Sequence, residues 1–182
     1  MLEKVRPASS KTDHLFVGTD QYAHFTLSWD GANARFRNEH VLEDLEDNTA
    51  RDSTTGSKCL VDPEGRVMAL DFFEGRTTII PLKQPRKGRK RGGFSGSELG
   101  TPHTIRIPEF YIRSSAFLYG TDQPEVVLLY EDGNNKVNLK TRVFEIDAKG
   151  DFVRESSGSR LSRVALDNAA TLLIPVPQPP GL

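Results

Sequence analysis

The stretch Cys59–Leu82 decides the fold, and it reads CLVDPEGRVMALDFFEGRTTIIPL. Asp62–Gly65 and Glu74–Gly75 consist of residues that form tight turns, and the runs around them are rich in β-branched and aromatic residues. The segment therefore predicts three short antiparallel strands joined by two turns, without helical periodicity. A tight meander of this kind is typical of one blade of a β-propeller or of part of a β-sandwich.

The strand pattern continues on both sides of this stretch. His14–Thr19 and Tyr22–Trp29 predict two strands, and polar and apolar residues alternate along the second. Glu125–Tyr130 contains a continuous apolar run, which is typical of a strand buried on both faces. Residues 1–11 indicate only a short polar segment. Further strands are expected at residues 35–40, 104–107, 110–118, 136–146 and 165–176.

About ten strands and no helix predict an all-β chain, which we interpret as a partial β-propeller with about three antiparallel, WD40-like blades. A single domain is expected to occupy residues 1–182. Because propellers close with typically about 4–8 blades, we expect this domain to be truncated at both ends. Truncation would leave two unpaired blade edges, one of them beside Val126–Tyr130, and would favour self-association.

The overall composition is that of a soluble globular protein. Hydrophobic residues make up 36% of the chain and charged residues 27%, and the formal net charge of −1 provides no global attraction to nucleic acid or to an anionic membrane. The single cysteine, Cys59, excludes an internal disulfide and suits a reducing compartment. No apolar run approaches the roughly 20 residues that a membrane span needs. We therefore expect an intracellular protein with no membrane partner.

No arrangement of residues in the sequence indicates catalysis. The four histidines lack the spacing of a metal-binding helix, and a lone thiol at the start of an apolar strand behaves as a small buried hydrophobe. The acidic residues 43–47 lack the register of a calcium loop, and the glycines between residues 88 and 100 match no nucleotide-binding motif. We therefore expect no catalytic residue, no metal site and no cofactor.

Positive charge is concentrated in residues 83–103, where glycines and prolines interrupt the strand pattern. We interpret this segment as a flexible, disordered basic insertion. Its charge density fits a nuclear-import signal, contacts to the phosphates of nucleic acid, or a solvated surface loop. Aromatic interleaving, which would favour single-stranded nucleic acid, is missing apart from Phe94. The candidate residues are Lys83, Arg86, Lys87, Arg89, Lys90 and Arg91.

A series of sequence blocks, taken in order, carries a family resemblance from about Asp13 to Gly181. The blocks are Asp13–Phe16, Thr55–Gly56, Val61–Leu70, Phe73–Gly75, Ile79–Leu82, Phe117–Gly120, Pro124, Tyr130–Asp132 and Leu173–Pro177. Their order and spacing resemble the first propeller of the damage-specific DNA-binding protein 1 family, the large subunit of the UV-damaged-DNA-binding complex. Relatives of that family include the largest subunit of the cleavage and polyadenylation specificity factor and a spliceosomal propeller subunit.

The resemblance implies a non-catalytic adaptor of a cullin-RING ubiquitin ligase that acts in DNA-damage repair in the nucleus. In that family the second of three propellers binds the cullin, while the first and third hold substrate receptors, so receptors and cullin ligase components are the implied partners of the full-length protein. The resemblance assigns no contact residues in this chain.

Two other interpretations of the function stay open. A nucleic-acid-binding subunit of an RNA-processing factor, in cleavage and polyadenylation or in splicing, would bind DNA or RNA through the basic residues, with an affinity that falls steeply with salt. An enzyme would need a convergent polar pocket, which strand patterns do not reveal.

Overall fold

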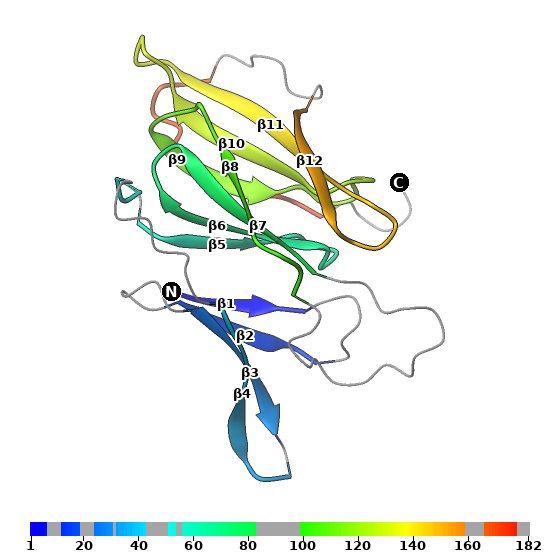
Figure 1. Cartoon of the computed structure of the whole chain (residues 1–182). Coiled ribbons are helices and arrows are strands. Elements are labelled where there is room, and N and C mark those ends of the chain that lie inside the picture. The colour runs from blue at the N-terminus through cyan, green and yellow to red at the C-terminus, as the bar shows by residue number, and fades with distance from the viewer. Residues whose placement is uncertain are drawn as a thin grey trace.

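The structure, a computed structural model, contains only β-strands and their connections (Figure 1). It describes residues 1–6, 12–18, 24–30, 32–42, 51–53, 56–82, 99–158 and 166–177. These ranges hold twelve strands and no helix, which confirms the predicted all-β class. Accordingly, the described part of the chain has no helix that is long and apolar enough to cross a membrane.

The strands form three antiparallel sheets, and each sheet is a meander of four consecutive strands. This arrangement confirms the prediction of about three blades of a partial propeller. The first sheet contains β1 (Leu2–Val5), β2 (His14–Gly18), β3 (His24–Asp30) and β4 (Arg35–Leu42). The second contains β5 (Lys58–Val61), β6 (Val67–Phe73), β7 (Arg76–Pro81) and β8 (His103–Arg106). The third contains β9 (Ile112–Phe117), β10 (Glu125–Glu131), β11 (Val137–Ile146) and β12 (Phe152–Ser157).

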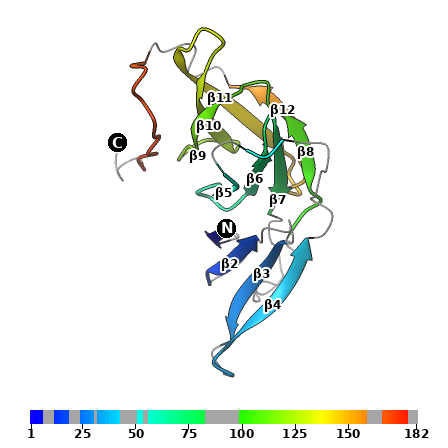
Figure 2. The same cartoon turned by 90° about the vertical axis from the view of Figure 1, so that its left-hand side faces the viewer.

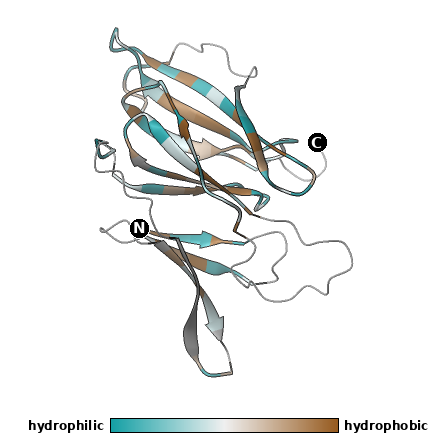
Figure 3. Ribbon diagram, in the orientation of Figure 1, coloured by the Kyte–Doolittle hydropathy of each residue, from teal (hydrophilic) through white to brown (hydrophobic). Residues whose placement is uncertain are grey.

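The three sheets are stacked, and their first strands lie side by side, β1 beside β5 and β5 beside β9 (Figure 2). Alternate residues of β6 enter two different apolar layers, so that this strand is buried on both faces. Figure 3 shows the resulting alternation of hydrophobic and hydrophilic residues along the strands. The layer between the first two sheets contains Val5, Phe16, Cys59, Met68, Leu70, Phe73, Ile80, Leu82 and Leu99. The layer between the second and third sheets contains Val67, Ala69, Ile79, Ile107, Phe117, Val126, Leu128 and Phe144.

The second sheet begins with the meander that the sequence predicted. Gly65 and Gly75 have φ angles of 66° and 72°, in the left-handed region that glycine adopts without steric cost. The Gly65 N–H donates a hydrogen bond of 2.8 Å to the Asp62 carbonyl, which closes the first turn. β5, β6 and β7 follow in antiparallel register, with one irregularity between Leu70 and Phe73 in β6. The prediction for this stretch is therefore confirmed.

The chain contains two strands that the sequence reading missed. Leu2–Val5, expected to be part of a polar segment, pairs with β2 as β1 and buries Val5 completely. Phe152–Ser157 pairs with β11 as β12 at the edge of the third sheet. Both strands are short and at least half polar, so their pairing partners rather than their own hydrophobicity determine them.

Two other expectations are wrong. The final strand predicted at residues 165–176 is not formed, because the described residues 166–177 are a turn followed by extended chain without a ladder partner. Pro175 and Pro177 lack the N–H that a ladder requires. The unpaired edge expected beside Val126–Tyr130 is also absent, since β10 lies between β9 and β11.

The predicted basic insertion is described only at its C-terminal end. Leu99 is buried and bridges Leu82, and His103 begins β8, so ordered structure begins before residue 103. The six candidate residues Lys83, Arg86, Lys87, Arg89, Lys90 and Arg91 lie outside the described residues.

Candidate functional site

The connections between strands are gathered at two opposite ends of the second and third sheets, because consecutive strands run in opposite directions. We call one end the groove end: it carries the β6–β7 turn, the β8–β9 connection and the β10–β11 turn. We call the other the stapled end: it carries the β5–β6 turn, the β7–β8 connection and the β9–β10 turn.

An open groove of about 800 Å³ lies between the second and third sheets at the groove end. This volume falls within the range of roughly 300–1,000 Å³ that is typical of ligand-binding sites. We call it the aromatic groove, because three aromatic rings are among its lining residues. These residues are Arg51, Glu74, Pro108, Glu109, Phe110, Tyr111, Tyr130, Glu131, Asp132 and Gly133.

Two of the aromatic rings are unusually open to solvent. Phe110 is 59% exposed and Tyr111 is 63% exposed, although Glu109, which precedes them in the sequence, is buried. Tyr111 has a φ angle of 53°, in the left-handed region that a bulky side chain seldom adopts. Its carbonyl accepts a hydrogen bond of 3.3 Å from the Glu131 N–H, which joins the β8–β9 connection to β10. Exposed aromatic residues on a fixed backbone are typical of binding surfaces.

The connection that carries these rings is anchored by the carboxylate of Glu109, which is buried between β8 and β11. It accepts hydrogen bonds of 2.6 Å from Lys140 Nζ and of 2.6 Å from Arg142 Nη2. Burial opposes ionisation, but these bonds outweigh it and lower the pKa of Glu109 below its usual value. Arg142 also donates to Glu155 on β12, so that one buried guanidinium links three elements.

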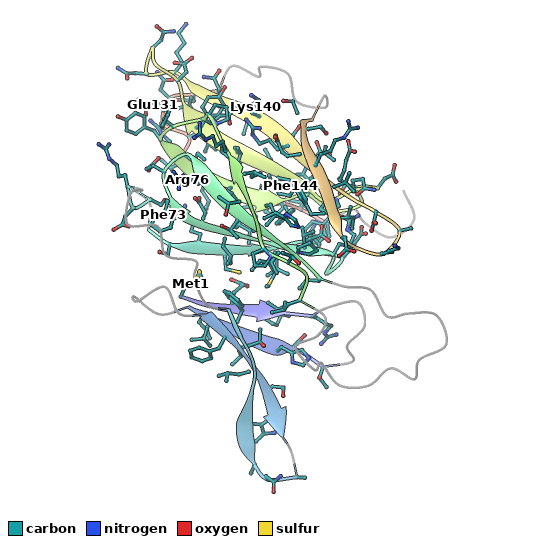
Figure 4. All side chains as sticks on the ribbon, viewed as in Figure 1. Met1, Phe73, Arg76, Glu131, Lys140 and Phe144 are labelled. Atoms are coloured by element: carbon teal, nitrogen blue, oxygen red, sulfur yellow. The ribbon has the colours of Figure 1, made fainter. Side chains whose placement is uncertain are left out.

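The rim of the groove is held by further hydrogen bonds. The Ile107 N–H donates to the Gly75 carbonyl at 2.9 Å and ties the β8–β9 connection to the β6–β7 turn. Arg113 Nη2 lies 2.6 Å from the Glu131 carboxylate. Figure 4 labels Glu131 and Lys140 on the third sheet and Arg76 on the second, at this end of the molecule. The groove is therefore largely preformed.

The carboxyl of Asp71 is buried beside the groove end, where β6 departs from regular pairing. Burial raises the pKa of Asp71 to about 6, and Lys58, its partner on β5, opposes this shift. Glu74, in the adjacent turn and on the groove wall, raises the pKa further. The charge of Asp71 in the folded protein therefore changes with pH around pH 6.

At the stapled end one arginine closes the gap between the two sheets. Arg66 donates two hydrogen bonds of 2.8 Å to the buried carboxylate of Asp62, within the β5–β6 turn. Its Nη1 also donates to the carbonyls of Thr121 and Asp122, at 2.7 Å and 3.1 Å, in the β9–β10 turn. The Asp62 side chain is fully buried. Such fork-shaped pairing fixes the relative position of both turns.

Two chemical properties of the described residues bear on metal and thiol chemistry. These residues include no group of three or more histidine, cysteine, aspartate or glutamate residues that could hold a metal ion. Burial raises the pKa of the Cys59 thiol to about 12, so the sulfur stays protonated and is a poor nucleophile at neutral pH. The exposed aromatic rings of the groove are suited to contacts with another molecule.

The sequence-based candidates lie outside the described residues, so the structure places only the two ends of the β7–β8 connection that contains them in the sequence. These described ends, Leu82 and Leu99, are at the stapled end. The sequence reading missed the groove, because it assigned Phe110 and Tyr111 to the beginning of a strand. Pro108 was the available signal, since a proline just before two aromatic residues favours a break in the strand pattern.

Comparisons with known proteins agree with this architecture. The family model of the RSE1/DDB1/CPSF1 first β-propeller matches residues 1–182. DNA damage-binding protein 1 of Schizosaccharomyces pombe is 35% identical over 136 residues, covering 75% of this chain and 13% of the relative. DNA damage-binding protein 1 of Oryza sativa is 33% identical over 181 residues, covering 99% and 15%. DNA damage-binding protein 1b of Arabidopsis thaliana is 31% identical over 178 residues, covering 98% and 15%.

The chain thus spans 13–15% of the length of these relatives. Three four-stranded meanders and a family match over the whole chain lead to the same assignment. The chain belongs to the RSE1/DDB1/CPSF1 first β-propeller family.

Proposed function

We propose that this chain is a non-catalytic, protein-binding part of an adaptor of a cullin-RING ubiquitin ligase that acts in DNA-damage repair in the nucleus. The observation that carries the proposal is the family match over the whole chain, combined with relatives that are named DNA damage-binding protein 1. These names favour the adaptor over the RNA-processing alternative. Substrate receptors and cullin ligase components are the proposed partners of the full-length protein.

The geometry of the groove end supports a role in protein recognition. Binding energy at protein interfaces is concentrated in a few aromatic and arginine anchors, and rigid anchors lose little conformational entropy on binding. Phe110 and Tyr111 have this character, since the buried Glu109 fixes their backbone while their rings are exposed.

Affinity purification tests the proposal. The full-length gene product, carrying an epitope tag, is isolated from nuclei before and after ultraviolet irradiation, and the bound proteins are identified by mass spectrometry. We expect a cullin and several substrate receptors. Recovery of neither class would contradict the adaptor function.

A double variant, Phe110→Ala with Tyr111→Ala, refines this experiment. If the groove contacts receptors, the variant retains the cullin, which we assign to another propeller of the full-length protein, and recovers fewer receptors. Tyr119→Ala is the matched control, because Tyr119 is another exposed aromatic residue, 43% exposed, at the stapled end.

We also propose that the basic residues direct the protein to the nucleus. Replacing Arg86, Lys87, Arg89, Lys90 and Arg91 by alanine should shift a fluorescent fusion of the full-length product toward the cytoplasm. An unchanged nuclear fraction would contradict the import signal, and an unchanged affinity for DNA and RNA would contradict contacts to nucleic acid. The interpretation as a solvated surface loop would then be the one that remains.

A further inference from the structure

We propose that residues 171–177 are a docking edge for a β-strand that follows residue 182 in the full-length protein, and that the two together begin a fourth sheet. The inference goes beyond the proposed function, because it assigns a contact surface whether or not the protein is an adaptor. Three properties of the segment lead to it: its attachment beside β9, the prolines on one of its sides, and the exposed apolar residues on the other.

The segment is attached beside β9 without forming a ladder with it. Arg113 on β9 donates hydrogen bonds of 2.7 Å and 3.0 Å to the carbonyls of Asn168 and Ala170, just before the segment. The Leu173 N–H donates to the Ser114 hydroxyl at 3.1 Å. The segment, the red trace in Figure 2, therefore lies beside β9 much as β9 lies beside β5 and β5 beside β1. This is the position that the first strand of each further sheet takes.

Prolines remove hydrogen-bond donors from the side of the segment that faces β9. In an extended chain the N–H groups of successive residues point to opposite sides. The Leu173 N–H points toward Ser114, so Pro175 and Pro177 lie on the same side, and neither has an N–H. The two prolines thus prevent the segment from joining the third sheet as a fifth strand.

The opposite side of the segment keeps its backbone donors and acceptors. Leu172, Ile174 and Val176 carry the N–H and C=O groups on this side. Within the described part of the chain, these groups have no hydrogen-bond partner. An edge of this kind is a template for the addition of another strand.

The side chains of the same three residues form an exposed apolar stripe. Leu172 is 67% exposed, Ile174 75% and Val176 79%, whereas Leu173 and Pro175 between them are half-buried. Residues 171–177 contain no charged side chain. Contiguous exposed apolar residues mark interaction sites, and permanent interfaces are more apolar than transient ones. The stripe therefore favours a permanent neighbour over a transient partner.

A strand of the same polypeptide fits this requirement. The curated relatives have most of their length outside the part that this chain matches, and the matching family model describes the first of their propellers. In each described sheet the first strand pairs antiparallel with the next strand along the chain: β1 with β2, β5 with β6 and β9 with β10. A strand that follows residue 182 and returns along the stripe would repeat this order.

The test measures amide hydrogen exchange at single-residue resolution, by mass spectrometry, in the purified full-length gene product. We expect the amides of Leu172, Ile174 and Val176 to exchange at least about 100-fold more slowly than in an unstructured peptide. Exchange at the unstructured rate would overturn the inference. Protection that increases with protein concentration would identify a second copy as the occupant, and protection that requires an added protein would identify an external partner. Either result would also overturn it.

Variants of the full-length product assign the protection to the stripe. Ile174→Asp should accelerate exchange at Leu172 and Val176 about tenfold or more, because it places a charge in a covered apolar contact. Val153→Asp is the matched control, since Val153 is an apolar residue of β12 that is 58% exposed and lies outside the stripe. Equal exchange in the two variants would contradict the inference.

If Ile174→Asp fails to fold, Ile174→Ala decides, because it removes apolar contact without adding a charge. It should still accelerate exchange at Leu172 and Val176, whereas Val153→Ala should not. The affinity purification described above reports separately on the adaptor function. Protection of the stripe without recovery of cullin or receptors would support the docking edge and contradict the adaptor. Recovery of both without protection would have the opposite meaning.

Discussion

One arginine holds connections in place at each end of the second and third sheets, but the two ends differ in what they leave open. At the stapled end Arg66 reaches from one turn to the next and fills the gap between the sheets. At the groove end Arg142 lies deeper, on β11, and holds the loop through Glu109 rather than by crossing the gap. The same kind of interaction thus closes one end, whereas at the other it supports the walls of a groove.

Among the changes that test this comparison, removal of Arg142 should have the largest effect on stability. Arg142→Met would leave the buried carboxylate of Glu109 with Lys140 alone, and loss of one partner of a buried ion pair typically costs about 3–5 kcal/mol. Urea unfolding should show this loss in the free energy of unfolding. Recovery of receptors in the affinity purification should also fall, because the loop that carries Phe110 and Tyr111 loses its anchor.

Glu109→Gln combined with Arg142→Met tests the cause of that loss. Because the double variant removes both charges, it should be more stable than Arg142→Met alone. If both variants were equally unstable, loss of packing rather than of charge pairing would explain the effect.

Arg66→Met should have a smaller effect on stability, about 2–3 kcal/mol, since the Arg66 side chain is 11% exposed and water can partly replace its bonds to Asp62. This change is at the stapled end, so the recovery of receptors in the affinity purification should stay the same. A loss of receptors equal to that of Arg142→Met would show that the two ends are coupled.

The stability at the groove end should depend on pH, because the carboxyl of Asp71 is buried beside it. Its pKa is about 6 in the folded protein and 3.8 in a free side chain, so the folded state binds its proton more tightly. Stability from this group is complete below about pH 4 and is lost as the pH rises through about 6, with a total of roughly 3 kcal/mol. Asp71→Asn should therefore be more stable than the parent at pH 7 and should lose this advantage at pH 4. An advantage that stays constant with pH would contradict the assignment.

The smallest effect on stability is expected at the exposed rings. Phe110→Ala and Tyr111→Ala should each change the free energy of unfolding by less than about 0.5 kcal/mol, because surface substitutions usually do. Relief of the left-handed conformation of Tyr111 is not involved, since alanine also has a Cβ. A melting temperature close to that of the parent, together with a lower recovery of receptors, would separate recognition from folding.

The sequence predicted the elements whose signals are local. The turns at Asp62–Gly65 and Glu74–Gly75 and the apolar run at Val126–Tyr130 specify their own structure, and the structure agrees. β1 and β12 were not predicted because each is a short strand, at least half polar, at the edge of its sheet. Their conformation follows from the neighbouring strand rather than from their own residues.

The groove could not be predicted for a related reason. Its walls come from four connections that are far apart in the sequence, between Arg51 and Gly133, and only the stacking of two sheets brings them together. Sequence alone would also suggest that Glu109 is an ordinary surface residue. Its partners Lys140 and Arg142 lie on β11, far from it in the sequence. The segment at 166–177 shows the opposite error. Its apolar residues indicated a strand, but its prolines lack the N–H that strand pairing requires.

The buried thiol of Cys59 has a practical consequence. It lies in the layer between the first and second sheets, and its proton is retained at neutral pH. Alkylating reagents attack the thiolate, so labelling can proceed only while these two sheets are transiently separated. The rate of labelling in dilute urea would therefore report how often that junction opens, without any probe having to be introduced.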